Sequence, residues 1–192
     1  MRKREFLLPI DCCPICGAKD TFRVRGRIDD IPYFGELMET FASCTSCKFK
    51  HADVMSLSER PPARYEFQIT SEEDLNVRVV KSSTGTLKLP ELGVTVEPGP
   101  ASQGYVSNIE GVLGRVKEAI KLAIEKVDAP RRRRGKARIK KLDEVGAGKR
   151  RVRLILMDPF GHSAIVDERA KRRELTKREL ALLRGTPSPS GA

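Results

Sequence analysis

Cys13-Pro14-Ile15-Cys16 and Cys44-Thr45-Ser46-Cys47 are two Cys-x-x-Cys pairs, and they decide how the N-terminal part of the chain folds. Each pair spaces two thiolates so that both can reach one metal ion, and two such pairs complete a tetrahedral set of four sulfur ligands. We therefore predict a zinc ribbon with one zinc ion, bound by Cys13, Cys16, Cys44 and Cys47. Two disulfides or four idle thiols are the alternative. The N-terminus does not resemble a secretory signal, which argues against disulfides.

A zinc ion with four protein ligands has no open position for water or substrate. We expect this zinc to be structural, with no catalytic residue around it. Cys12 lacks the two-residue spacing to Cys16 and is interpreted as a bystander thiol. Metal-spaced cysteines fit a reducing compartment, so we expect a cytoplasmic protein. No apolar run approaches the ~18 residues that a membrane-spanning helix needs.

The positive charge of the chain is concentrated in one segment. The 192 residues carry a net charge of +11, and the segment from Arg131 to Arg153 alone contributes +10. The remainder is nearly neutral. Such a concentration indicates a local contact with an anion or a solvated loop, and not a uniformly cationic protein.

Residues 1–60 are predicted to form the zinc ribbon. Phe22, Val24 and Ile28 alternate with three arginines, which is the period of a half-exposed strand. Residues 37–43 and 48–57 supply two further strands. Three short strands around a metal site form a unit too small to fold without its metal.

Residues 61–185 are predicted to form a β body, with the boundary at Pro61-Pro62 and a disordered tail at 186–192. Short β-rich segments bounded by Gly and Pro indicate a barrel or sandwich. These segments are 64–70, 75–82, 86–92, 94–97, 152–157 and 163–166. Thr176 to Glu179 has the pattern of a capping box that opens a short helix.

A helical hairpin is predicted within the β body, at about 108–147. Apolar residues recur at three- and four-residue steps from Val112 to Val127, after a capping box at 107–110. A second, shorter helix is expected around Ile139 to Val145. The tip of the hairpin is then the run Arg131, Arg132, Arg133 and Arg134, a candidate anion contact.

Several stretches of the chain resemble the ZPR-type zinc-finger family. They are CPICG at 13–17, IPYFGEL at 31–37, LNVRVVKS at 75–82, LPEL at 89–92, SNIEGVL at 107–113 and LMDPFGHSAI at 156–165. They occur in the family's order and cover most of residues 9–166. The chain departs from the family at Lys48, where a Gly usually follows the last zinc cysteine, and this departure is expected to strain the knuckle slightly. It carries one module, as the archaeal form does.

The resemblance implies a fold and a partner. The fold is mainly β with inserted α: a zinc ribbon followed by a double-stranded β-helix, or jelly-roll-like, domain with a helical hairpin insertion. The partner of the eukaryotic family member is translation elongation factor 1-alpha, a GTPase. The expected function is a protein-binding factor that helps to fold or regulate this GTPase, by analogy.

Six residues are candidate partner contacts. Tyr33 and Phe34 are aromatic and follow Pro32 on the ribbon loop, although packing against the β body is an equal alternative. Asn76 and Arg78 share one face of a predicted strand, with Lys81 on the other. Asp158 opens a turn, and maintenance of that turn is its simpler role.

Two alternative functions depend on other features of the sequence. Nucleic-acid or ribosome binding could use the basic segment 131–153, but no aromatic residue occurs from Val106 to Leu156, so stacking on bases is not expected. Such binding would be weak and sensitive to salt. Catalysis is not expected. A metal-dependent oxygenase needs two histidines and a carboxylate around an open metal, and His51 and His162 are far apart in the chain.

Overall fold

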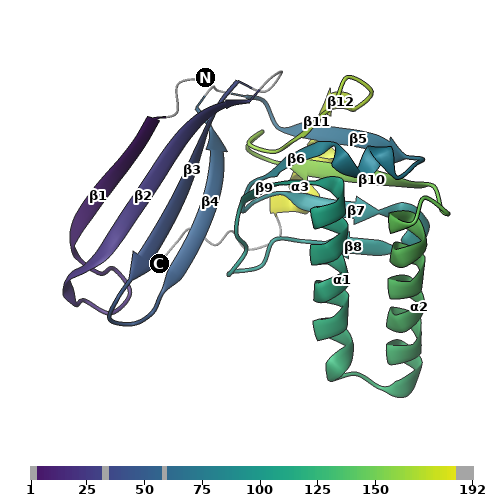
Figure 1. The fold of residues 1–192 in the computed structure, drawn as a ribbon, viewed down its shortest axis with the longest axis horizontal. Coiled ribbons are helices and arrows are strands. Elements are labelled where there is room, and N and C mark those ends of the chain that lie inside the picture. The colour runs from purple at the N-terminus through teal and green to yellow at the C-terminus, as the bar shows by residue number, and fades with distance from the viewer. Residues whose placement is uncertain (1–3, 32–34, 58–59, 185–192) are drawn as a thin grey trace.

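The computed structural model describes residues 4–31, 35–57 and 60–184, which form a ribbon sheet beside a two-sheet β body with a projecting helical hairpin (Figure 1). The candidate contacts Tyr33 and Phe34 and the expected tail at 186–192 lie outside the described residues. None of the helices in the described part is long and apolar enough to cross a membrane.

The ribbon is a four-stranded antiparallel sheet, one strand larger than predicted. Its strands follow chain order: β1 (Arg4–Cys12), β2 (Lys19–Ile31), β3 (Gly35–Cys44) and β4 (Lys50–Ser56). The additional strand is β1, which pairs with β2 from Arg4↔Ile28 to Cys12↔Lys19. Strand β1 was not predicted because neither of its faces is buried. Leu7, Leu8 and Ile10 are all at least 40% exposed, and the strand therefore lacks the alternation of apolar and polar residues that marks a half-buried strand.

The β body contains a five-stranded and a three-stranded sheet. The first has the order β12-β5-β10-β7-β8 and the second β11-β6-β9, all pairs being antiparallel. The bounds are β5 (Ala63–Ile69), β6 (Arg78–Lys81), β7 (Thr86–Leu89), β8 (Val94–Val96), β9 (Tyr105–Asn108), β10 (Val152–Asp158), β11 (Ala164–Val166) and β12 (Lys171–Glu174). Two short 3-10 helices, η1 (Glu73–Asn76) and η2 (Pro90–Leu92), connect them.

Strand β10 is the centre of this body. It pairs with β5 on one side and β7 on the other, and its residues from Leu154 to Asp158 are all buried. A strand covered on both faces reads as a continuous apolar run, as Leu154–Met157 does. Strands occur in each predicted segment, but those at 75–82 and 86–92 are shorter than predicted because η1 and η2 take up part of these segments. Strands β9 and β12 were not predicted.

The helical hairpin is confirmed, with α1 (Ile109–Glu125) followed by α2 (Ala129–Gly146). The N-cap of α1 is Asn108, whose side chain accepts from Gly111 N, and not Ser107 as the capping-box pattern suggested. α2 is not the shorter helix: it spans 18 residues against 17 for α1. The helices approach closely at Gly135, where a Cβ would collide with Ile124.

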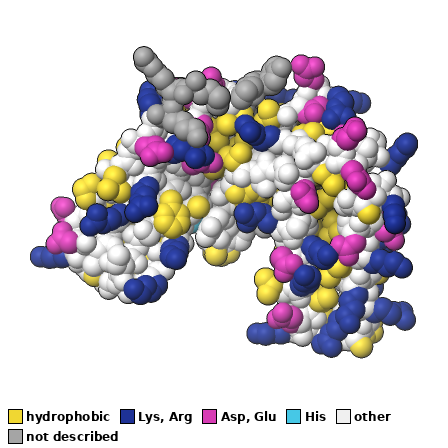
Figure 2. Space-filling view, in the orientation of Figure 1, with side chains coloured by type: hydrophobic (Ala, Val, Ile, Leu, Met, Phe, Trp, Pro, Cys, Tyr) yellow, Lys and Arg dark blue, Asp and Glu magenta, His cyan; other side chains and the backbone are white. Residues whose placement is uncertain are grey.

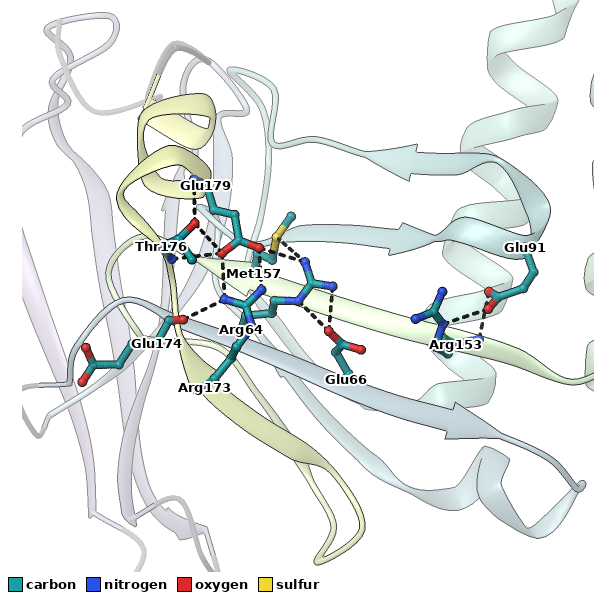
Figure 3. Close-up of polar contacts among 9 residues, drawn as sticks. All are labelled: Arg64, Glu66, Glu91, Arg153, Met157, Arg173, Glu174, Thr176 and Glu179. Carbon is teal, nitrogen blue, oxygen red and sulfur yellow. Dashed lines mark hydrogen bonds and ion pairs between the residues drawn. The ribbon is translucent and has the colours of Figure 1, made fainter.

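The predicted capping box before α3 (Lys177–Arg184) is present. Glu179 N donates to the Thr176 hydroxyl, and Thr176 N donates to the Glu179 carboxylate. Glu179 also forms ion pairs with Arg64 of β5 and Arg173 of β12, at 3.0 and 2.6 Å. Figure 3 shows both guanidinium groups turned towards the Glu179 carboxylate. These ion pairs fix the C-terminal helix against the edge of the five-stranded sheet.

The ribbon and the β body share one hydrophobic core. Ile31, Leu37 and Val54 of the ribbon belong to the same buried cluster as the core of the body. A backbone hydrogen bond of 3.0 Å from Gly104 N to Ala52 O joins β4 to the segment before β9. Pro61-Pro62, the expected boundary, lies between β4 and β5. A single short connection therefore links the ribbon sheet to the β body.

Candidate functional site

The four metal-spaced cysteines meet at one end of the ribbon, where β2 begins and β3 ends. Ile31 lies at the opposite end of the ribbon. All four sulfur atoms lie within 4.8 Å of one another. The distances from Cys13 Sγ to Cys47 Sγ and from Cys16 Sγ to Cys44 Sγ are both 3.9 Å. Tetrahedral zinc with bonds of about 2.3 Å requires sulfur atoms about 3.8 Å apart. The geometry and the donor set therefore fit a single zinc ion.

Each pair of cysteines is held by a tight knuckle that directs its sulfur atoms inward. In the first knuckle Gly17 N donates to Cys13 O and Cys13 N to Ala18 O, at 2.8 and 2.9 Å. Gly17 has φ +71°, a conformation that glycine adopts without strain. In the second knuckle Lys48 takes the equivalent role with φ +63°, so the departure from the family pattern falls where the backbone is left-handed.

Neighbouring polar groups lower the pKa of Cys44 and Cys16, whereas at Cys47 a backbone hydrogen bond from Phe49 is outweighed by burial and the other thiols, which raise the pKa of Cys47 to about 11. The Thr21 hydroxyl lies 3.4 Å from Cys44 Sγ, and this contact lowers the pKa of Cys44 to about 6. A backbone hydrogen bond from Ala18 likewise lowers the pKa of Cys16. Hydrogen bonds to a thiolate stabilise its charged form. The sequence reasoning did not identify Thr21, because a lone threonine in a strand carries no metal signature.

The core behind the knuckles is small. Cys13, Phe22 and Cys44 are buried together, with Val24, Ala42 and Phe49 packed against them. His51 stacks on Phe49 at 6.4 Å between ring centroids and takes part in this packing. So little apolar surface cannot hold the end of a ribbon by itself. A zinc ion held by all four cysteines would supply the missing cross-link and would have no open position for a substrate.

The remaining candidate contacts divide into an exposed and a buried pair. Asn76, in η1, and Arg78, in β6, are exposed. Lys81 is 5% exposed and Asp158 is fully buried, so neither presents its side chain to a partner in this structure. Burial lowers the pKa of Lys81 to about 8, against the opposing attraction of Asp158 and Asp53.

Asp158 organises the loop between β6 and β7. Its carboxylate accepts hydrogen bonds from the hydroxyls of Ser82, Thr84 and Ser163 at 2.6, 2.9 and 2.5 Å, and from Phe160 N at 2.9 Å. Ser82 and Ser163 are also buried. The buried carboxylate is surrounded by hydroxyls of its own fold, which agrees with a role in maintaining the turn.

A second carboxylate joins this loop to the ribbon, and sequence reasoning missed it. Asp53 of β4 accepts from Ser83 N at 2.9 Å and from the Ser83 hydroxyl at 2.7 Å. Ser83 is buried and Asp53 is half-buried, so these bonds are partly shielded from water. The two residues are 30 positions apart, and no local pattern connects them.

The four predicted anion contacts lie in the first turns of α2 and not in a loop. Arg132 donates to the carbonyls of Ile124, Glu125 and Val127 at 3.3 Å each and so caps the end of α1. All four arginines are exposed. Figure 2 shows basic side chains gathered at the free end of the hairpin.

Comparison with known proteins identifies the family. The ZPR1 jelly-roll domain model matches residues 73–181. The chain is 45% identical over 179 residues to a ZPR1-like protein of Pyrococcus horikoshii, covering 91% of this chain and 80% of that protein. The chain belongs to the ZPR1 family. The predicted resemblance, the ribbon and jelly-roll fold class, and zinc as the cofactor are thereby confirmed.

Other ZPR1 relatives extend from archaea to eukaryotes. A ZPR1-like protein of Methanocaldococcus jannaschii is 43% identical over 176 residues, or 90% of this chain and 87% of that protein. The zinc finger chaperone zpr1 of Schizosaccharomyces pombe is 34% identical over 107 residues, or 54% of this chain and 22% of that protein. The chain thus corresponds to a fraction of the longer eukaryotic relative.

Proposed function

We propose that this ZPR1-family protein is a zinc-organised binding factor for translation elongation factor 1-alpha, acting in the cytoplasm as a chaperone or regulator of that GTPase. The observation that carries the proposal is a metal centre closed by four cysteines within a family that includes a zinc finger chaperone. A closed site organises a surface and leaves the metal no position for substrate. The proposed role is therefore binding, without catalysis.

The mechanism assigns separate tasks to the parts of the molecule. Cys13, Cys16, Cys44 and Cys47 hold zinc and keep β2 and β3 in register at the end of the ribbon. Asp53 and Ser83 hold the ribbon against the β body. Exposed residues of both parts, such as Arg78, then present a preorganised surface, which reduces the entropy lost when a partner binds.

A pull-down with the zinc-loaded protein from extract of the source organism tests the proposal. We expect elongation factor 1-alpha to be recovered at low salt and to remain bound at high salt, because a partly apolar interface is less screened than a purely ionic one. Treatment of the extract with ribonuclease should leave the recovery unchanged. Absence of the factor at both salt concentrations would contradict the proposal.

A second candidate function is binding of RNA or ribosomes by the hairpin. Four arginines occupy the first turns of α2, where the helix dipole disfavours positive charge, and a bound anion would offset that cost. Phosphates would then contact Arg131, Arg133 and Arg134. A gel-shift assay with single-stranded RNA should show weak binding that disappears at high salt, and no shift at low salt would exclude this function.

A further inference from the structure

A groove of 350 Å³ lies between the helical hairpin and the edge of the five-stranded sheet. Residues 93–95, at β8, line it together with residues of α1 and α2. The two helices are held close along the groove at Gly135, where a Cβ would collide with Ile124. We call this feature the hairpin groove. It depends on the packing of the hairpin against the sheet edge, and it lies outside the ribbon.

The α1 side of the hairpin groove is apolar. Four aliphatic residues of α1 line it at three- and four-residue steps, which place them on one face of the helix. They are Ile120, Ala123, Ile124 and Val127. Ala123 is exposed and the other three are half-buried, so part of this aliphatic surface is open to a ligand. A partner that covers it with apolar groups would gain by removing both surfaces from water.

The α2 side of the hairpin groove is cationic. Arg131, Arg134 and Arg138 are three and four residues apart, and they line the groove together. Arg138 Nε donates to Leu92 O at 3.2 Å, which fixes this half-buried guanidinium at the groove. Arg134 is exposed and forms no hydrogen bond or ion pair with any residue that the structure describes. Arg131 has only a 3.9 Å contact with the exposed Asp128.

The charges of the hairpin groove call for an anionic occupant. None of the described residues that line it is acidic, so no carboxylate of the groove opposes an incoming one. Each guanidinium can bind a carboxylate through two parallel hydrogen bonds. Three of them beside one aliphatic strip fit a segment that carries acidic and apolar side chains together.

This combination favours a protein segment over a nucleic acid. The described lining of the groove contains no aromatic side chain on which a base could stack. A phosphate chain would use the arginines and leave the aliphatic strip uncovered. Such a chain would also have no reason to prefer the groove, since Arg133 is equally exposed in the same run and lies outside it.

We propose that the hairpin groove receives an acidic, amphipathic segment of the partner protein, with apolar side chains of that segment on α1 and its carboxylates on Arg131, Arg134 and Arg138. The inference rests on the proposed function, because it takes elongation factor 1-alpha as the partner. It adds the site of contact and the chemistry of the segment that binds there.

The test measures binding of the purified, zinc-loaded full chain to purified elongation factor 1-alpha by isothermal titration calorimetry. Arg134→Glu reverses the unpaired charge at the groove and should weaken binding by about tenfold or more. Ala123→Gln keeps a good helix former but places an amide on the apolar side. It should weaken binding by about threefold or more, because the amide loses water without gaining a partner.

Arg133→Glu is the matched control. Arg133 is exposed and adjacent to Arg134 in the same helix, but it does not line the groove, so binding should change by less than about twofold. Both substitutions introduce a glutamate near the N-terminus of α2, where the helix dipole favours negative charge. The two variants should therefore keep the fold of wild type, which thermal unfolding followed by circular dichroism checks.

The outcomes separate this inference from the proposed function. If wild type binds the factor and Arg134→Glu binds equally well, the groove is not the site, while the proposed function stands. Equal losses in Arg134→Glu and Arg133→Glu would indicate general electrostatic attraction and would overturn the inference. A gel shift of single-stranded RNA that Arg134→Glu abolishes, with binding of the factor unchanged, would assign the groove to RNA instead. If wild-type protein does not bind the factor, both the proposed function and this inference fail.

Discussion

The carboxylate of Asp53 in the ribbon accepts two hydrogen bonds from Ser83 in the β body, one from the backbone nitrogen and one from the hydroxyl. Asp53 Oδ1 also accepts from Val54 N at 2.7 Å. Three donors thus converge on one side chain at the point where the two parts meet. This arrangement makes Asp53 a polar link between the part that binds zinc and the jelly-roll domain.

Replacement of Asp53 should therefore weaken the junction. Asp53→Ala leaves the N–H of buried Ser83 without an acceptor, and we expect the free energy of unfolding to fall by about 1–3 kcal/mol in urea titrations. Glu118→Ala is the control, because Glu118 is exposed and, among the residues that the structure describes, pairs only with Lys121 on the same helix. That change should cost less than about 0.5 kcal/mol. Equal stability of the Asp53 variant and wild type would argue against the link.

Loss of one zinc ligand should unfold the knuckle end of the ribbon. Cys44→Ser removes a buried sulfur ligand, and the few apolar residues around it cannot replace the metal. We expect zinc content to fall from one ion per chain to well below one, with rapid amide exchange in β2 and β3 near the knuckles. The jelly-roll core should stay protected, because its cluster is separate from the small one behind the knuckles.

Cys12→Ser provides the matched control for the zinc experiment. Cys12 is an exposed thiol next to Cys13, but it is not among the four sulfur atoms that meet. Its replacement should leave zinc content and amide exchange unchanged. Full zinc binding by Cys44→Ser, with native exchange, would show that the assigned ligand set is wrong.

Lys48→Gly should stabilise the zinc-loaded protein. Lys48 has φ +63°, and the left-handed conformation costs a residue with a Cβ about 1 kcal/mol more than it costs glycine. The gain is reduced by loss of the 2.8 Å bond from Lys48 Nζ to Thr45 O, and glycine also makes the unfolded chain more flexible. Lys48→Ala separates the effects, since it removes the bond and keeps the strain. Thermal unfolding should rank Lys48→Gly above Lys48→Ala.

The lowered pKa of Asp74 predicts that the protein loses stability in acid. Burial on its own raises the pKa of this carboxyl, but hydrogen bonds from Thr70 and an ion pair with Arg169 outweigh it and lower the pKa to about 2. The folded state therefore binds a proton less readily than the unfolded chain. The resulting stabilisation, on the order of 2 kcal/mol, is complete above about pH 4 and is lost as the pH falls towards 2.

The Asp74→Asn variant tests this pH dependence. It should be less stable than wild type at neutral pH, and the difference should shrink between about pH 4 and pH 2, where wild type loses its advantage. Urea unfolding at several pH values in this range measures the slope. A constant difference down to the lowest pH would show that Asp74 does not titrate as the structure indicates.

Local patterns in the sequence predicted the elements that depend on local interactions. Helix α1 could be predicted from the sequence because its buried residues Val112, Leu113 and Val116 recur on one face. The zinc site could be predicted because two Cys-x-x-Cys pairs fix the ligands by spacing alone. The helical hairpin was predicted from the same periodicity. The predicted start of α2 was too late in the chain, because a run of four arginines resembles a solvated loop.

Elements defined by distant partners could not be predicted in this way. β9 and β12 are four-residue strands that exist through pairing with β6 and β5. The link between Asp53 and Ser83 brings together residues from separate parts of the chain. The burial of Asp158 also depends on the assembled fold, because three hydroxyls from two loops surround it.

The most direct test of the central claim compares zinc-loaded and zinc-depleted wild-type protein in binding to purified elongation factor 1-alpha. Chelation should disorder the knuckle end of the ribbon and weaken binding by about tenfold or more, and restoring one equivalent of zinc should recover it. Binding of equal strength with and without zinc, or no binding in either state, would contradict the account.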